Sequence, residues 1–212
     1  ATQPVRMLTV TGVAVVKVKP DQAKLTWTIE ARADAPASAM SALSSKTASI
    51  LAALEAFGLP KEDLASSVLS LSPNFQYIDR QPPKLLDYSA TTRLEVTINH
   101  LPAFLENVQI GLDLGVTALG NLVFPTKDEA RWQSLARQNA MKDALVKAQD
   151  YAEASDVKLG QLISLTDRVA ERSGPPGFLS AQRGLSEAGI VPKDVAFRQS
   201  VIAQYEIVAK PE

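Results

Sequence analysis

The chain has 212 residues, of which 46% are hydrophobic and 21% charged, a composition typical of a globular protein with a buried core and unlike that of a disordered one. Its 22 Lys and Arg residues nearly balance 23 Asp and Glu residues, so the sequence gives no broad electrostatic reason to expect a nucleic-acid partner. Because there is no cysteine, disulfides, thiolate metal sites and a cysteine nucleophile are excluded.

Two amphipathic strands are expected at the start of the chain. Apolar or small residues occupy every second position over 8–18, and over 23–31 apolar residues alternate with polar ones, which gives each segment one apolar face. The turn residues Lys19-Pro20-Asp21 separate the two segments. The sequence therefore predicts an antiparallel hairpin that is buried on one side.

An amphipathic helix is expected next. Pro36 suits a first helical turn, apolar residues recur at three- and four-residue steps as far as Phe57, and Gly58 ends the pattern. The face away from the apolar stripe is rich in serine. It is interpreted as a solvated face, with close packing against a partner helix as the alternative. Its members are Ser38, Ser41, Ser44, Ser45 and Ser49.

Two further strands are predicted over 68–77 and 88–98, joined by a polar, proline-containing loop over 79–84. Three aromatic residues flank this loop, and they form either an exposed binding rim or a cap on the end of the sheet. These residues are Phe75, Tyr77 and Tyr88.

A shorter helix is predicted over 101–114 and a short strand over 116–124. The stretch 101–124 is the most apolar long segment, but charged and amide residues interrupt it, so no membrane span is expected. The helix residues expected to face inward are Phe104, Leu105, Val108 and Leu112.

The longest helix is predicted to begin with a capping box at Thr126, with Glu129 three residues later, and to run to about Ser155. Asp143 and Lys147 form a favourable i,i+4 pair on its wet side. Small residues recur every four positions and allow close approach to a sheet or another helix. They are Ala136, Ala140, Ala144, Ala148 and Ala152, and they follow Trp132 at the same spacing.

Strands over 159–169 and 201–207 close the predicted fold. Between them lies an irregular, glycine- and proline-rich insertion at about 173–198, of a length that is usually functional or mobile. The predicted order is ββαββαβαββ. This order indicates one α+β domain over 1–212, with mostly antiparallel sheet and helices packed on one face.

No catalytic, cofactor-binding or metal-binding constellation is recognised in the sequence, so no such residue is assigned. Ser186 lies in a segment that only faintly resembles a nucleophile elbow, with the wrong spacing and no preceding strand. His100 is the single histidine, and a structural or solvent-exposed role is favoured over a catalytic or metal-binding one.

Two pairs of neighbouring carboxylates could act in acid–base catalysis, but a structural role is favoured for each pair. Asp128 and Glu129 occupy a first helical turn, where the helix dipole stabilises negative charge. Glu62 and Asp63 follow Pro60 in what is expected to be a short helical turn.

Several short motifs together resemble the SIMPL-domain family over roughly residues 8–209. The opening Thr11-Gly12-Val13-Ala14, followed by Val18-Lys19-Pro20-Asp21-Gln22-Ala23, is similar to the start of that family. Pro192-Lys193-Asp194 departs from the Pro-Gly that the family often shows before its last strand. Further similar stretches are the helix that ends at Phe57-Gly58-Leu59, then Leu69-Ser70-Leu71-Ser72-Pro73-Asn74-Phe75, Asp87-Tyr88-Ser89-Ala90, and the alanine-rich helix before Leu159-Gly160-Gln161-Leu162.

The resemblance implies a bacterial protein exported to the periplasm or outer envelope, of unsettled biochemical function. It also implies ring-like oligomers in some members and a link to oxidative-stress tolerance in others. No catalytic residue is implied. The opening Ala1-Thr2-Gln3-Pro4 fits a mature chain after signal removal, although a trimmed chain would open in the same way.

We therefore expect a non-enzymatic envelope protein that acts through self-assembly or partner binding, with a stress-tolerance role as a further expectation. A homo-oligomer is expected, and an envelope protein is the other expected kind of partner. Exposed edge strands, the late loop and the two small-residue helix faces are the candidate contact surfaces. The alternatives are a periplasmic small-molecule binding module with Tyr77, Tyr88 and Trp132 near a pocket, and a hydrolase that uses His100.

Overall fold

The computed structural model describes residues 6–168, 185–186, 189–190 and 192–209, which form two compact units. The α1–α2 unit comprises residues 20–125 together with 185–186, 189–190 and 192. The α3 unit comprises residues 6–19, 126–168 and 193–209. The elements follow the predicted order ββαββαβαββ, with one extra pair of two-residue strands before the last strand, so the predicted α+β fold with mostly antiparallel sheets is confirmed.

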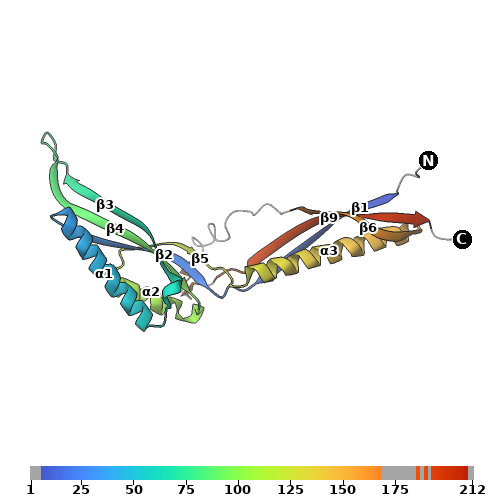
Figure 1. Ribbon diagram of the computed structural model, residues 1–212, viewed down its shortest axis with the longest axis horizontal. Helices are drawn as coiled ribbons and strands as arrows, with labels where there is room; N and C mark the ends of the chain where they lie inside the picture. The colour runs from blue at the N-terminus through green and yellow to red at the C-terminus, as the bar shows by residue number, and fades with distance from the viewer. Residues whose placement is uncertain (1–5, 169–184, 187–188, 191, 210–212) are drawn as a thin grey trace. The chain divides into compact units, whose positions relative to one another are not determined.

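The α1–α2 unit is a four-stranded sheet with two helices on one face (Figure 1). Its strand order is β3-β4-β2-β5, and every neighbouring pair is antiparallel. The elements are β2 (Ala23–Ala33), α1 (Pro36–Ala56), η1 (Lys61–Asp63), β3 (Leu64–Gln76), β4 (Lys84–Ile98), η2 (Leu101–Ala103), α2 (Phe104–Asp113) and β5 (Ala118–Val123).

Alternation along β2 and β4 builds the core of this unit. Residues opposite each other in an antiparallel pair share a face, so Trp27 and Leu94 both point to the helices, as do Ile29 and Thr92. Trp27 is fully buried among these apolar side chains. α1 begins with Pro36 in its first turn, as predicted, and buries one apolar stripe against the sheet.

α2 presents only part of the predicted face to the core: Phe104 is buried and Val108 packs against the core, as predicted. Leu105 and Leu112 are exposed, whereas Asn107 and Gly111 are buried with Phe104. The reason is Trp27: a Cβ at position 111 would lie 2.5 Å from its ring, so only glycine lets α2 lie this close to the indole. The predicted inward positions of Leu105 and Leu112 are therefore wrong.

The α3 unit is a three-stranded antiparallel sheet with one long helix on one face (Figure 1). Its strand order is β1-β9-β6, with β9 in the centre. Its elements are β1 (Met7–Val18), α3 (Glu129–Ala154), β6 (Val157–Arg168) and β9 (Val195–Ala209).

The alanine ridge of α3 is buried against this sheet, as its spacing predicts. The contact is so close that a Cβ at Gly12 of β1 would lie 2.0 Å from the carbonyl oxygen of Ala140. Small side chains on both partners are therefore what allow this helix to lie on the strand. The predicted use of Ala136–Ala152 as an intermolecular contact surface is wrong, because these side chains face their own sheet.

The predicted hairpin between the first two strands is also wrong. β1 pairs with β9, and β2 pairs with β4 and β5, so the two strands belong to different units. Lys19-Pro20-Asp21 lies at the boundary between the two units. Both strands have the predicted alternation, but alternation specifies which face is buried and not which strand lies alongside.

The predicted capping box does not form. α3 begins at Glu129 with Asp128 as its N-cap residue, and no side chain caps the helix. Thr126 lies before the helix and is buried.

Of the insertion predicted at about 173–198, residues 173–184, 187–188 and 191 lie outside the described residues. The two-residue strands β7 (Leu185–Ser186) and β8 (Gly189–Ile190) pair with each other. β9 already begins at Val195, inside the range expected to be irregular. The prediction of a single domain over 1–212 stays a prediction.

Candidate interaction surface

The edge strand β3 is exposed at every residue except Leu64 and Asn74, which are partly buried. No residue of β3, all of which is described, is buried. β3 is hydrogen-bonded to β4 on one side, and the other side of β3 is the edge of the sheet. An edge strand carries a row of unpaired backbone N–H and C=O groups, which makes it a template for pairing with another chain.

Leucines on β3 point to the helix side of the sheet but lie beyond the helices. Leu69 is opposite Thr92, and Leu71 is opposite Ala90, and both of these β4 residues are buried in the core. Leu69 is nevertheless 62% exposed and Leu71 41%. The sequence predicts a strand over 68–77, but only the packing of the helices shows that these two leucines remain uncovered.

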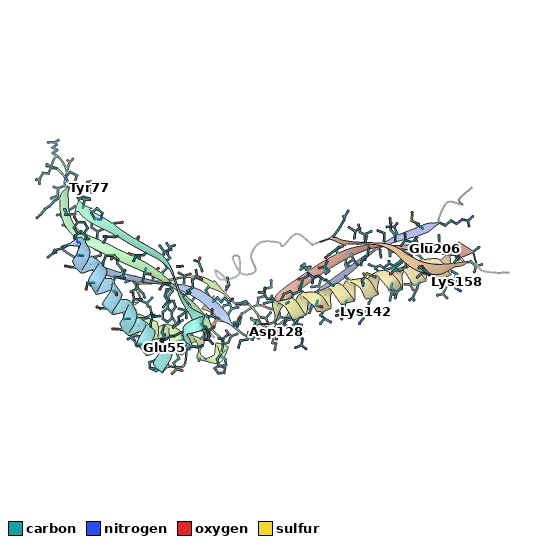
Figure 2. All side chains as sticks on the ribbon, viewed as in Figure 1. Glu55, Tyr77, Asp128, Lys142, Lys158 and Glu206 are labelled. Carbon is teal, nitrogen blue, oxygen red and sulfur yellow. The ribbon has the colours of Figure 1, made fainter. Side chains whose placement is uncertain are left out.

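The end of the β3–β4 hairpin is also apolar. β2 ends opposite Tyr88, so the hairpin beyond it has no neighbouring strand. Tyr77 lies at the free end (Figure 2) and is 77% exposed. Clusters of exposed apolar side chains on a monomer mark interaction sites. We call the following residues the hairpin arm: Leu69, Leu71, Phe75, Tyr77, Ile78, Leu85 and Leu86, all of which are exposed.

An apolar pocket lies at the opposite edge of the same sheet, between α2 and β5. Its volume is about 350 Å³. Leu119 of β5 is opposite Trp27, which places this pocket on the helix side of the sheet. Because α2 turns Gly111 toward Trp27, Leu105 faces the pocket and not the core. The sequence pattern placed Leu105 in the core and therefore did not predict this pocket. The lining residues are Leu25, Phe104, Leu105, Val108, Leu119, Gly120, Asn121 and Leu122.

The α3 unit protects its β1 edge in a way that the α1–α2 unit does not protect β3 or β5. Asp143 of α3 accepts a hydrogen bond from the Val13 N–H at 2.8 Å, and Lys147 donates to the Thr11 carbonyl at 3.1 Å. These two bonds occupy backbone groups of β1, and an edge strand covered by a helix in this way is less open to pairing with another chain. Within the described part of α1 and α2, no side chain forms a corresponding bond to β3 or β5.

Asp143 and Lys147 also bond to each other at 2.7 Å, which confirms the predicted i,i+4 pair. The hydrogen bond from Lys147, supplemented by the Val13 N–H, lowers the pKa of Asp143 below its ordinary value of 3.8. A lowered folded-state pKa means that this stabilisation is present above the unfolded-state pKa and is lost as the pH falls through the folded-state value.

Acidification should therefore weaken the α3 unit more in the natural chain than in Asp143→Asn. We expect the natural chain to be more stable at pH 6, by less than about 1 kcal/mol because the pair is partly exposed. The difference should shrink as the pH falls below the ordinary value of 3.8, because the unfolded chain takes up the proton there and folded Asp143 does so only at lower pH. Urea unfolding of both chains at pH 6 and pH 3 measures it, and a difference that stays constant between the two pH values would contradict the linkage.

The residues considered for chemistry do not converge. His100 is exposed and precedes η2 as its N-cap residue. Asp63 accepts a hydrogen bond from Asn99, and Glu62 is its neighbour in the short η1 turn, which the sequence predicts. The side chain of Ser186 lies outside the described residues. Among the described residues, no three acidic or histidine side chains gather in a way that could hold a metal ion.

The three aromatic residues predicted near a ligand pocket do not line the α2–β5 pocket. Tyr77 lies at the exposed hairpin end, and Tyr88 packs partly buried against the core of the α1–α2 unit. Trp132 belongs to the α3 unit, where it lines a separate hollow of about 300 Å³ on α3, so of the three residues it alone borders a described pocket. The guanidinium of Arg131 lies 4.9 Å from its ring centre. The serine-rich face of α1 is exposed, as expected for a solvated face.

The sequence is similar to proteins of one bacterial family. A protein named "26 kDa periplasmic immunogenic protein" from Brucella melitensis is 28% identical over 187 residues, which cover 86% of this chain and 73% of the relative. The protein of that name from Brucella abortus matches to the same extent. "Uncharacterized protein YggE" from Escherichia coli strain K12 is 26% identical over 165 residues, 78% of this chain and 67% of the relative.

Within the described residues, no helix is both long and apolar enough to cross a membrane. The sequence profile of the SIMPL family, described as proteins of unknown function (DUF541), matches residues 8–205. Because this match spans both units and nearly the whole sequence, the chain belongs to the SIMPL family.

Proposed function

We propose that this chain is a non-enzymatic periplasmic protein that acts through self-assembly or through binding a protein partner, with the hairpin arm as its contact surface. The observation that carries the proposal is the exposure of the arm's apolar side chains next to an unprotected sheet edge. Burial of such side chains in a contact stabilises it by roughly 25 cal/mol per Å² of apolar surface removed from water, before the entropic cost of association.

The periplasmic location is supported by the names of the Brucella relatives, which describe periplasmic proteins. The non-enzymatic assignment is supported by the absence of a recognised catalytic motif in the sequence. A role in stress tolerance rests on the family resemblance alone, and no residue of this chain carries it.

The native mass of the purified chain, measured by light scattering after size exclusion at two concentrations, tests this proposal. We expect a discrete oligomer for the natural chain and a shift toward monomer for Leu69→Ser/Leu71→Ser. Both leucines lie on an exposed strand face, so the substitution removes apolar surface without opening a cavity in the core.

The matched control is Val13→Ser/Val15→Ser. These residues are also exposed, also two positions apart and also on an edge strand, at 54% and 48% exposure. This variant should keep the mass of the natural chain. A natural chain that is monomeric at both concentrations, and that retains no partner from periplasmic extract, contradicts the proposal.

The α2–β5 pocket supports a second candidate function, a small-molecule binding module. Its volume of about 350 Å³ is at the lower end of the range typical of ligand sites, roughly 300–1,000 Å³. Thermal unfolding across a panel of small apolar periplasmic metabolites tests it. A ligand should raise the midpoint for the natural chain and not for Val108→Trp, which fills the pocket, and uniformly unchanged midpoints exclude this function.

A further inference from the structure

We propose that the free edge of β5 in one copy of the chain pairs with the free edge of β3 in the next copy. The α1–α2 sheets of neighbouring copies then join into one continuous antiparallel sheet. This inference rests on the proposed self-assembly and names the two surfaces that make the contact.

Strand direction is the first argument. In the order β3-β4-β2-β5 every neighbour is antiparallel, so β3 and β2 run one way while β4 and β5 run the other. A second copy placed beside the first in the same orientation brings its β3 next to β5 of the first. These two strands are then antiparallel, so the join repeats the pattern of the rest of the sheet.

The two faces of the sheet give the second argument. A copy added in the same orientation keeps its helices on the same side of the joined sheet. Leu69 and Leu71 of the added copy point to that side, and so does Leu119, which borders the α2–β5 pocket. Across the sheet Leu119 is level with Ser66, and Leu69 and Leu71 pair two and four β4 residues further along, at Thr92 and Ala90 instead of Leu94. A join shifted along the strands by that amount brings the exposed leucines against the apolar pocket, and each surface then supplies the apolar cover that the other lacks within its own unit.

The lengths of the strands fit this join. β5 has six residues. On β3, Pro73 has no N–H to donate, and a register shift falls between Ser66 and Val68. The regular segment between them, 68–72, contains both exposed leucines. Pairing over this segment leaves the hairpin end, with Tyr77, free to extend along the neighbouring copy.

The contact joins two different surfaces, the β5 edge of one copy and the β3 edge of the next. A row of copies therefore always has a free β3 edge at one end and a free β5 edge at the other. Such a contact produces a closed ring or an open chain and not a two-fold dimer. A two-fold dimer through β3 alone would also bury Leu69 and Leu71. It would leave the β5 edge and the pocket uncovered. The β3–β5 join covers the β5 edge and the pocket as well as the two leucines, and for that reason we favour it.

The chain has no cysteine, so engineered cysteines provide a clean test. Ser70 and Ser72 of β3, and Ala118 and Gly120 of β5, are exposed and lie on the sheet face away from the helices. Four double variants combine Ser70→Cys or Ser72→Cys with Ala118→Cys or Gly120→Cys. A disulfide needs Cβ atoms about 3.5–4.5 Å apart. Because β4 and β2 separate the two positions, no bond can form within one chain.

After oxidation, at least one double variant should give a ladder of covalent dimers, trimers and larger species on a denaturing gel, reversed by reductant. Each single variant should remain a monomer on that gel, as should the control Val15→Cys combined with Ala118→Cys. Light scattering on the reduced double variants shows whether assembly is retained.

The outcomes separate the inference from the proposed function. A discrete oligomer that gives no ladder in any of the four registers overturns the β3–β5 join but leaves self-assembly standing. Covalent dimers from Ser70→Cys or Ser72→Cys alone indicate a two-fold β3 contact and also overturn it. A monomeric natural chain overturns both.

Discussion

Gly12→Ala is expected to destabilise the α3 unit severely, although it adds a single methyl group. The new Cβ would lie 2.0 Å from the carbonyl oxygen of Ala140 and 2.7 Å from the Cβ of Ala144. The Ala140 carbonyl oxygen belongs to the α3 backbone and the Ala144 Cβ is bonded directly to it, so neither atom can move away unless the helix shifts. Overpacking of this kind costs about 1–3 kcal/mol and more where the backbone itself must shift.

Hydrogen exchange measured by mass spectrometry checks this prediction, because it reports the protection of each element separately. Peptides from β1, β9 and α3 should lose protection. The matched control is Gly120→Ala, the same chemical change at a position where an added Cβ meets nothing within 4 Å. Unchanged protection of α3 in Gly12→Ala would show that the helix does not depend on this close approach.

Trp27→Ala is expected to have the largest effect on the α1–α2 unit. Trp27 is fully buried, lies in the centre of the core cluster and contacts Gly111 of α2. Removal of the indole leaves a large cavity between the sheet and α2. Truncations of buried Phe or Trp to Ala typically cost about 3–5 kcal/mol.

Trp27→Phe is the matched control. Trp27 Nε1 has no hydrogen-bond partner in the described part of the chain, so phenylalanine loses volume but no hydrogen bond. Its cost should be well below that of alanine. Urea denaturation followed by far-ultraviolet circular dichroism compares the three chains, and equal losses for both variants would contradict the cavity argument.

Local sequence patterns predicted most of the elements. Pro36 and the apolar stripe after it specify α1, because the proline fixes the first turn and the stripe has the helical period. Alternation specifies β2 and β4 with the correct buried faces. Alanines at four-residue spacing predict the face by which α3 packs closely, and that face is buried against β1 and β9.

The failures with the largest consequences concern which elements lie next to each other and which face of a helix meets the core. β1 was paired with β2 because they are consecutive and a turn lies between them, yet β1 pairs with β9, almost the whole chain away. Leu105 and Leu112 were assigned to the core because they are apolar, whereas Trp27 and Gly111 set the rotation of α2.

The sequence by itself determined the fold class, the order of the elements, the family and the buried face of most strands, because these depend on local periodicity and composition. Only the tertiary structure decided the division into two units, the exposure of Leu69 and Leu71, and the pocket beside β5. The division follows from the pairing of β1 with β9, and the exposed leucines and the pocket follow from how α1 and α2 cover their sheet. Contacts between residues far apart in the chain set both.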